Sequence, residues 1–364
     1  MHRTIKITVM ILLWIFVAAF VVVFDRRAAP HHAKPKVRAL AVDIVDSLRD
    51  ETLVSSDAVR RWIAGSKIAT VGVPLAEVDL AGIEQAILRN GFVERANAYV
   101  TYDGELRVEV SQRRPLLRLL VDGYDCYVTA DGFVFPAPRS ASAYVPVVTG
   151  SYAPPVPPKY VGRVEDHIAS RVAESEARIV EMQYEKVPLF QSDKAVEDSL
   201  RSVRRMRIKK GLFESHDHFD ERVAALRARK ADLRRDYRYR QREIERKLDA
   251  VTARQDAERE NQKKLHKRYE DFLKLINFVN YIEEDSFWRA EIVQIVVSTM
   301  SSGDPEIELV PRAGDHTVLL GSLDDVDEKL ERLLSFYENG LRNIGWESFR
   351  TISVKYKGQV VCTK

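Results

Sequence analysis

The sequence predicts an α+β protein with an N-terminal transmembrane helix, a small β-α-α-β-β domain, and an antiparallel β domain interrupted by a long helical, coiled-coil-like insertion. Three observations lead to this prediction. Residues Ile7 to Phe24 contain no charged side chain, the apolar spacing changes from about 3.6 to about 2 near Phe92, and a basic stretch after Pro158 carries apolar residues in a 3, 4 ladder. The 364 residues are enough for two modest domains or one domain with a long insertion.

The N-terminal uncharged run is 18 residues long. At about 1.5 Å per helical residue it spans about 27 Å, close to the hydrocarbon thickness of a bilayer. A cleaved signal peptide is the alternative, but its apolar core has about 7 to 15 residues and ends in small side chains, whereas this run ends in Val23 and Phe24. We therefore expect a short tail at residues 1–6, a membrane-spanning helix at 7–24 and a linker at 25–36. Two Lys or Arg residues precede the run and five follow it closely, a count that favours a cytoplasmic location for the large domain.

The next part, residues 37–114, is predicted to form the β-α-α-β-β domain. A strand-like run at 37–45 is followed by a helix capped at Ser55 and by a second helix that opens at Asp79. Residues 92–102 are rich in β-forming side chains, and an Asp-Gly turn joins them to a strand with alternating apolar residues. The five elements of this compact domain are complete by about Arg114.

The β domain is predicted at residues 115–152 and 272–364, where short apolar runs alternate with glycine turns. Residues 153–271 are predicted to be a linker and a basic helical insertion. The linker begins at the proline-rich segment 153–158, because proline cannot donate to a sheet.

The insertion concentrates the positive charge of the chain. Between Arg201 and Glu270 there are 23 Lys and Arg against 13 Asp and Glu, a local net charge of +10, whereas the whole chain has +3. The apolar ladder is typical of a coiled-coil seam, but Gln255, Glu258 and Gln262 occupy ladder positions and make its middle polar. We expect one helix of roughly 100 Å from about Phe219 to Glu284, projecting from the globular body.

The order of these segments resembles the bacterial cell-division family FtsQ, called DivIB in some lineages. The residues that carry the resemblance are Val78, Asp79, Leu80, Ile83, Leu88, Val93, Ala96, Val100, Leu106, Val108, Val110, Arg113, Arg114, Pro115, Asp131, Gly132, Phe135, Val145, Pro146, Val148, Thr149, Gly150, Phe287, Trp288, Ile292, Gln294 and Ile295. Two features depart from the family pattern: Gln112 replaces a glutamate before the Arg-Arg-Pro turn, and the basic stretch from about Arg163 to Arg268 has no counterpart in it.

This resemblance implies a noncatalytic protein without cofactors. Its first domain would be a POTRA domain, its N-terminus cytoplasmic, and its bulk periplasmic, anchored in the cell inner membrane at the division septum. It would act as a divisome scaffold for the membrane-anchored partners FtsB and FtsL. That orientation contradicts the Lys and Arg count, and we follow the resemblance. A membrane-anchored POTRA protein of outer-membrane or secretion assembly is the alternative, followed by a cytoplasmic coiled-coil adaptor.

The sequence contains few residues in patterns typical of catalysis or metal binding. The segment from Glu214 to Asp220 contains two histidines and three acids, but His216 and His218 cannot share a helix face, so a solvated polar turn is favoured over a metal site. There is no phosphate-binding loop or hydrolase motif, and we expect no small-molecule substrate. Interleaved acids and a periplasmic location argue against nucleic acid. Cys126 and Cys362 could pair in an oxidising compartment, or sit apart as small apolar side chains.

The positions most favoured for function lie in the terminal hairpin, whose two runs flank Lys357 and Gly358. An edge strand offers free amide and carbonyl groups, to which an extended partner segment can add a strand. In the resembling family the penultimate strand receives FtsB in this way, and the matching positions are Ile352, Ser353, Val354, Lys355, Tyr356 and Gly358. The alternative is that Val354 and Tyr356 only pack the core.

Overall fold

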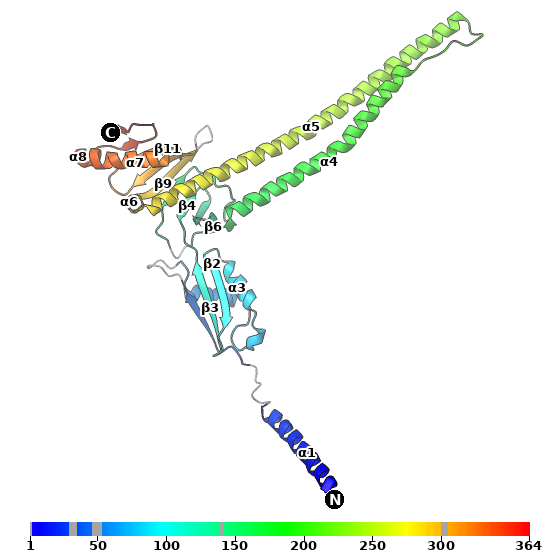
Figure 1. The fold of residues 1–364 in the computed structure, drawn as a ribbon. Helices are drawn as coiled ribbons and strands as arrows, with labels where there is room; N and C mark the ends of the chain where they lie inside the picture. The colour runs from blue at the N-terminus through cyan, green and yellow to red at the C-terminus, as the bar shows by residue number, and fades with distance from the viewer. Residues whose placement is uncertain (1, 29–34, 46–52, 139–141, 300–304) are drawn as a thin grey trace. The chain divides into compact units, whose positions relative to one another are not determined.

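The structure is a computed structural model that describes residues 2–28, 35–45, 53–138, 142–299 and 305–364 (Figure 1). The chain forms two compact units. Unit 1 contains Met1–Arg114 and Pro138–Tyr144, and unit 2 contains Pro115–Ala137 and Val145–Lys364. Half of the predicted linker 25–36, at residues 29–34, lies outside the described residues.

The first helix, α1, runs from His2 to Ala28. Its described apolar side chains are exposed on all sides of the helix, Trp14 at 66% and Phe16 at 70% among them. Within the residues that the structure describes, no helix meets the length and apolarity needed to cross a membrane.

The β-α-α-β-β prediction for the rest of unit 1 is confirmed. The chain passes through β1 (Ala39–Ile44), α2 (Ser56–Gly65), the short η2 (Leu75–Glu77), α3 (Leu80–Leu88), β2 (Val93–Val100) and β3 (Glu105–Gln112). The sheet order is β1-β3-β2, with β1 parallel and β2 antiparallel to β3. The predicted caps are present, because Ser55 accepts from the Ala58 amide at 3.2 Å and Asp79 from the Gly82 amide at 2.9 Å.

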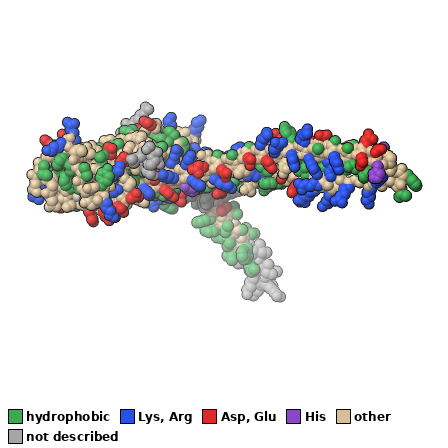
Figure 2. Space-filling view, turned by 90° about the horizontal axis from the view of Figure 1, so that it is seen from above, with side chains coloured by type: hydrophobic (Ala, Val, Ile, Leu, Met, Phe, Trp, Pro, Cys, Tyr) green, Lys and Arg blue, Asp and Glu red, His purple; other side chains and the backbone are tan. Residues whose placement is uncertain are grey.

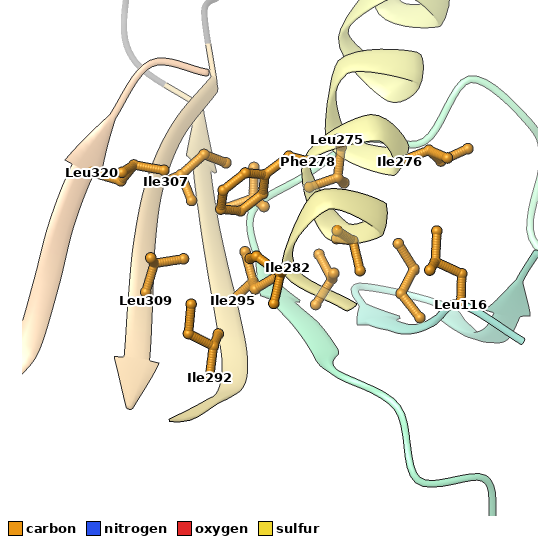
Figure 3. Close-up of a cluster of buried hydrophobic side chains, with 14 of the residues drawn as sticks. Leu116, Leu275, Ile276, Phe278, Ile282, Ile292, Ile295, Ile307, Leu309 and Leu320 are labelled. Atoms are coloured by element: carbon orange, nitrogen blue, oxygen red, sulfur yellow. The ribbon is translucent and has the colours of Figure 1, made fainter. Parts of the chain in front are cut away.

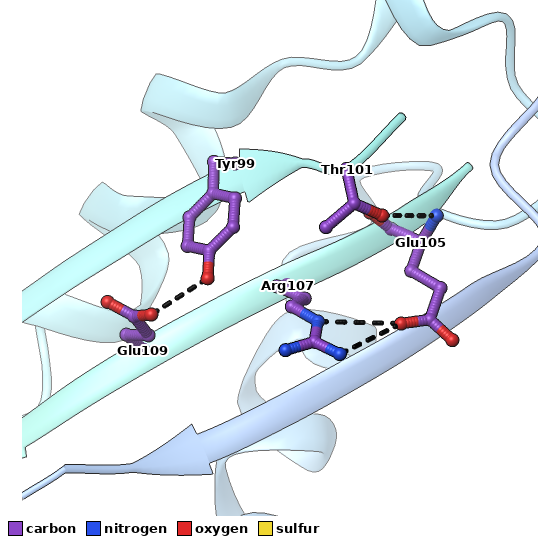
Figure 4. Close-up of polar contacts among 5 residues, drawn as sticks. All are labelled: Tyr99, Thr101, Glu105, Arg107 and Glu109. Carbon is purple, nitrogen blue, oxygen red and sulfur yellow. Dashed lines mark hydrogen bonds and ion pairs between the residues drawn. The ribbon is translucent and has the colours of Figure 1, made fainter. Parts of the chain in front are cut away.

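The two faces of this sheet differ. Apolar side chains from both helices and from β3 form a core on one face: Val59, Ile63, Ile83, Ile87, Leu106, Val108 and Val110. On the other face, Tyr99 donates to Glu109 at 2.8 Å, and Arg107 reaches Glu105 at 3.4 Å (Figure 4). The hydrogen bond to the Glu109 carboxylate raises the pKa of Tyr99. The alternation of apolar and polar residues follows the period-2 pattern of the sequence.

Unit 2 is built on one ten-stranded sheet with the order β13-β12-β11-β10-β9-β7-β4-β5-β6-β8. The strands are β4 (Leu117–Val121), β5 (Tyr124–Val128), β6 (Phe133–Pro136), β7 (Val147–Gly150), β8 (Gly162–Arg163), β9 (Ile292–Thr299), β10 (Pro305–Pro311), β11 (Thr317–Gly321), β12 (Thr351–Ser353) and β13 (Val361–Thr363). Four helical segments complete the C-terminal part: α6 (Ser286–Glu291), α7 (Val326–Phe336), η3 (Tyr337–Leu341) and α8 (Arg342–Ile344).

The prediction of an antiparallel β domain is wrong in part, because this sheet is mixed. β7 is parallel to both β4 and β9, and β11 is parallel to β12. Parallel neighbours need a long crossover connection. The chain supplies one between β7 and β9, through the helical insertion, and another between β11 and β12, through α7, η3 and α8.

The insertion forms a helical hairpin of two helices, α4 (Val164–Arg205) and α5 (His216–Glu284), which run side by side (Figure 1). The predicted helix from about Phe219 to Glu284 is therefore present within α5. Gln255 and Glu258 lie at the contact with α4, as the ladder predicts: Arg178 pairs with Glu258 at 2.8 Å and Lys186 donates to Gln255 at 2.6 Å. The contact is largely polar here, and the coiled-coil prediction is not supported.

The predicted helix does not project along its whole length, because its residues after 271 fall in the segment predicted for the β domain. The last turns of α5 belong to the core of unit 2, where Phe278 and Ile282 lie beside Ile295 and Ile307 of the sheet (Figure 3). All four side chains are at most 3% exposed. One end of α5 is thus held in the core, and the connection 206–215 lies at its other end.

Candidate functional site

The predicted edge strand is not at the edge of the sheet. β12 lies between β11 and β13, with Thr351 opposite Thr363, Ile352 opposite Cys362, and Ser353 opposite Val361. The edge assignment of β12 is therefore wrong. The reason is the terminal hairpin itself: β13 folds back antiparallel and pairs with the side of β12 that would otherwise be free.

The six predicted site residues have different environments. Ile352 and Val354 are fully buried and Ser353 is 8% exposed, so these side chains belong to the core. Tyr356 lies beyond the strand and is 52% exposed, which means that it does not share the packing of Val354. Gly358 has φ +73°, a turn conformation that suits glycine.

The remaining predicted residue, Lys355, forms an ion pair with Glu306 of β10. The Glu306 carboxylate raises the pKa of Lys355. The stem of Lys355 crosses Gly321, where an added Cβ would meet Lys355 Cγ at 2.8 Å. Lys355 therefore fastens the chain after β12 across two neighbouring strands.

We expect Lys355→Ala to lower the free energy of unfolding by about 1 kcal/mol or less, because the Lys355 side chain is 35% exposed and solvent screens the pair. Urea unfolding of the variant gives this value. Lys357→Ala, in the adjacent exposed turn, is the matched control and should be neutral. A loss of several kcal/mol at Lys355 would contradict the screened-pair interpretation.

The side of β13 that faces away from β12, which we call the free edge, is an end of the sheet. The Val354 amide donates to Leu319 and the Thr317 amide to the Arg350 carbonyl. Val354 and Arg350 flank β12, so Ile352 between them directs its backbone groups to β11. Thr351 and Ser353 therefore pair with β13, through Thr363 and Val361. It follows that the N–H and C=O groups of Cys362 point outward. Among the described residues, no strand pairs with this side.

The Cys362 side chain packs on the edge of the core, and partial burial raises the pKa of its thiol. Cys126 lies in β5 and is buried. Both cysteines are free thiols, so of the two alternatives open in the sequence, the structure has the unpaired one. The free edge thus presents backbone groups beside a small apolar side chain, an arrangement suited to an extended peptide strand.

The segment from Glu214 to Asp220 forms the start of α5 and the end of the connection before it. Glu214 accepts from Gly211, His218 and Arg222, and these contacts lower the pKa of Glu214 to about 2. Within the described part of the chain, no three His, Cys, Asp or Glu side chains are grouped as metal ligands. Glu214 here organises a turn.

Sequence reasoning located the terminal hairpin but missed that its last strand is the outer one. The pattern contained the information needed, because a hairpin turn at Lys357 and Gly358 requires the two final runs to pair with each other. That the other side of the penultimate strand is also occupied depends on β11, a non-local neighbour.

Two family models match the chain. Residues 36–111 match the model described as POTRA-like domain. Residues 257–363 match the model described as FtsQ/DivIB, C-terminal related. A comparison with curated proteins found no match. The second matched region begins within α5 and contains β9 to β13, including the free edge, whereas α4 and the outer half of α5 lie outside both regions.

Proposed function

We propose that this protein, which belongs to the FtsQ/DivIB family, is a noncatalytic scaffold of the bacterial divisome that links bitopic division proteins at the septum. The observation that carries the proposal is the free edge of β13 within the FtsQ/DivIB-related region. A sheet edge of this kind binds an extended segment through backbone hydrogen bonds and needs no catalytic residue.

The partners that we propose are membrane-anchored division proteins of the FtsB and FtsL type. A partner strand would continue the sheet beyond β13, with its amide and carbonyl groups facing those of Cys362. The exposed side chains of Val361 (43%) and Tyr356 (52%) lie near this edge in sequence and offer apolar contacts to such a strand. Backbone pairing supplies affinity, and side-chain contacts of this kind supply specificity.

We further propose that α1 anchors the chain in the inner membrane, with the N-terminus in the cytoplasm and both units in the periplasm. The support is the uncharged run from Ile7 to Phe24, whose length matches a bilayer when helical. A scaffold for bitopic proteins must lie at the membrane that holds them. The anchoring helix α1 and the free edge of β13 would therefore serve the same function.

A second candidate is a membrane-anchored protein of outer-membrane or secretion assembly, which the POTRA-like match favours. The match to the FtsQ/DivIB-related model covers the partner-binding edge and favours the division role. The two roles differ in where the protein must be found in a dividing cell.

The full chain fused to a fluorescent protein at its N-terminus tests the proposal. We expect the fusion to gather at midcell in dividing cells, because a divisome scaffold works only at the septum. A single-span inner-membrane protein with no role in division, fused to the same reporter, should label the whole envelope and serves as the control. Uniform envelope labelling by the full chain would contradict the division role and favour envelope assembly.

A further inference from the structure

The far end of the helical hairpin carries two large apolar side chains in water. The connection 206–215, which we call the hairpin tip, joins α4 to α5. Within it Leu212 is 95% exposed and Phe213 is 98% exposed, the highest values for any Leu or Phe among the described residues. Burying one such side chain is worth more than tenfold in a binding constant, so their exposure indicates a binding surface.

The hairpin tip has a defined conformation. Glu214, whose side chain is 9% exposed, accepts from the Gly211 amide at 2.9 Å, from His218 at 2.9 Å and from Arg222 at 2.6 Å. Lys230 of α5 donates to the backbone carbonyls of Arg204 and Met206, both at 3.1 Å, and so closes the end of α4. The turn is therefore built by contacts that do not involve Leu212 or Phe213.

A cluster of cations precedes these two side chains in the sequence. The ten residues 201–210 contain six Lys and Arg and no acid. Arg204, Arg205, Arg207, Lys209 and Lys210, which we call the basic cluster, are all exposed. On the other side of the tip, Glu214 is paired with His218 and Arg222, and three exposed acids, Asp217, Asp220 and Glu221, lie in the first turns of α5. Figure 2 shows Lys and Arg side chains gathered over the outer half of the hairpin, with hydrophobic side chains at its extremity.

We propose that the hairpin tip docks on a lipid bilayer that carries anionic headgroups, with Leu212 and Phe213 inserted into the interface and the basic cluster on the headgroups. Exposed apolar side chains beside a cluster of Lys and Arg are the combination that binds such surfaces, because hydrophobic insertion and attraction to anionic lipid act together. A protein pocket would need acids facing the five cations of the basic cluster as well as a cavity for two adjacent apolar side chains. A bilayer meets both needs without a matched shape.

The test uses the full chain with α1 held in a nanodisc of neutral phosphatidylcholine, so that the rest of the chain is free to meet added vesicles. Flotation with phosphatidylglycerol vesicles measures binding, and phosphatidylcholine vesicles are the comparison. We expect binding to the anionic vesicles only, weakening as salt is added. Equal binding to both vesicles, or none to phosphatidylglycerol at low salt, would overturn the proposal.

Three variants separate the contributions. Leu212→Ser with Phe213→Ser should weaken binding roughly a hundredfold, since two buried apolar side chains are lost. Replacing Arg207, Lys209 and Lys210 by Gln should also weaken it roughly a hundredfold, at about fivefold for each charge. Phe190→Ser is the matched control: Phe190 is 58% exposed but lies on the side of α4, so binding should be unchanged.

The variants also exclude other occupants. Full binding by the double serine variant would mean purely electrostatic attraction and would overturn insertion of the tip. An equal loss in Phe190→Ser would mean that the hairpin lies on its side. If sedimentation showed that the wild-type chain pairs with itself and the double serine variant does not, a second copy would be the occupant. The circular dichroism of every variant should match that of the wild type, because the contacts of Glu214 and Lys230 are retained.

Discussion

Gly150→Ala should lower the free energy of unfolding of unit 2 by about 3 kcal/mol or more, because its backbone conformation and its surroundings both exclude a side chain. Gly150 ends β7 and has φ +107°. A Cβ built there would overlap the Val297 carbonyl oxygen and lie 3.0 Å from the carbonyl carbon. Both are backbone atoms of β9, the parallel partner of β7, and cannot move aside without breaking that pairing.

For a unit of this size, such a loss lowers the melting temperature by roughly 6 to 12 °C, which thermal unfolding followed by circular dichroism measures. Gly358→Ala is the matched control, since Gly358 has φ +73° but nothing within 4 Å of an added Cβ. It should lose only about 1 kcal/mol, from backbone strain. Equal losses in the two variants would show that the Val297 backbone yields, and that the close approach of β7 and β9 is not a constraint.

Cys362→Pro should weaken binding of an FtsB-type partner segment at least tenfold while leaving the fold intact. The Cys362 amide points away from β12, so proline removes a donor needed only by an incoming strand, and that strand is left with an unsatisfied carbonyl. Proline is tolerated on edge strands for the same reason. The affinity of the purified chain for the periplasmic segment of the partner measures this effect.

Two controls accompany this variant. Cys362→Ala keeps the amide and should bind like the wild type, which separates the backbone from the thiol. Val361→Pro removes an amide that pairs with Ser353 and should destabilise the terminal hairpin before any partner is added. Ser353→Pro should do the same from the other strand. Undiminished binding by Cys362→Pro would place the partner elsewhere, with the POTRA-like domain as the next surface to test.

Much of the local structure follows from the sequence. The caps at Ser55 and Asp79 and the Asp-Gly turn before β3 are set by neighbouring residues, and each is found where the pattern indicates, whereas α5 begins at His216, inside the segment predicted as a polar turn. The parallel pairing of β7 was not predicted, since its partners lie in β4 and far along the chain in β9. Local alternation of apolar residues does not record the direction of a distant partner.

In the helical hairpin, too, the local structure could be predicted from the sequence and the contact between distant segments could not. The length of α5 could be predicted from the ladder, but α4 was not recognised as its partner. α4 contains Pro188 and contacts α5 through polar groups such as Ser175 and Arg178, so it lacks the apolar stripe by which packed helices are usually found. The candidate site was placed one strand too early for a related reason. The composition of β12 indicates a strand, but that β12 is paired on both sides depends on β11 as well as on β13.

The clamped end of α5 has a mechanical consequence. α5 continues for 69 residues without a break, about 100 Å, from the hairpin tip to Phe278 and Ile282 in the core. α5 can therefore act as a lever, because a short segment at one end is buried in the core and the rest of the helix lies outside it. A small sideways force at the tip therefore produces a large torque at the buried end of α5, where the helix packs on the sheet that includes β13. A force applied at the tip therefore also loads the sheet that carries the free edge.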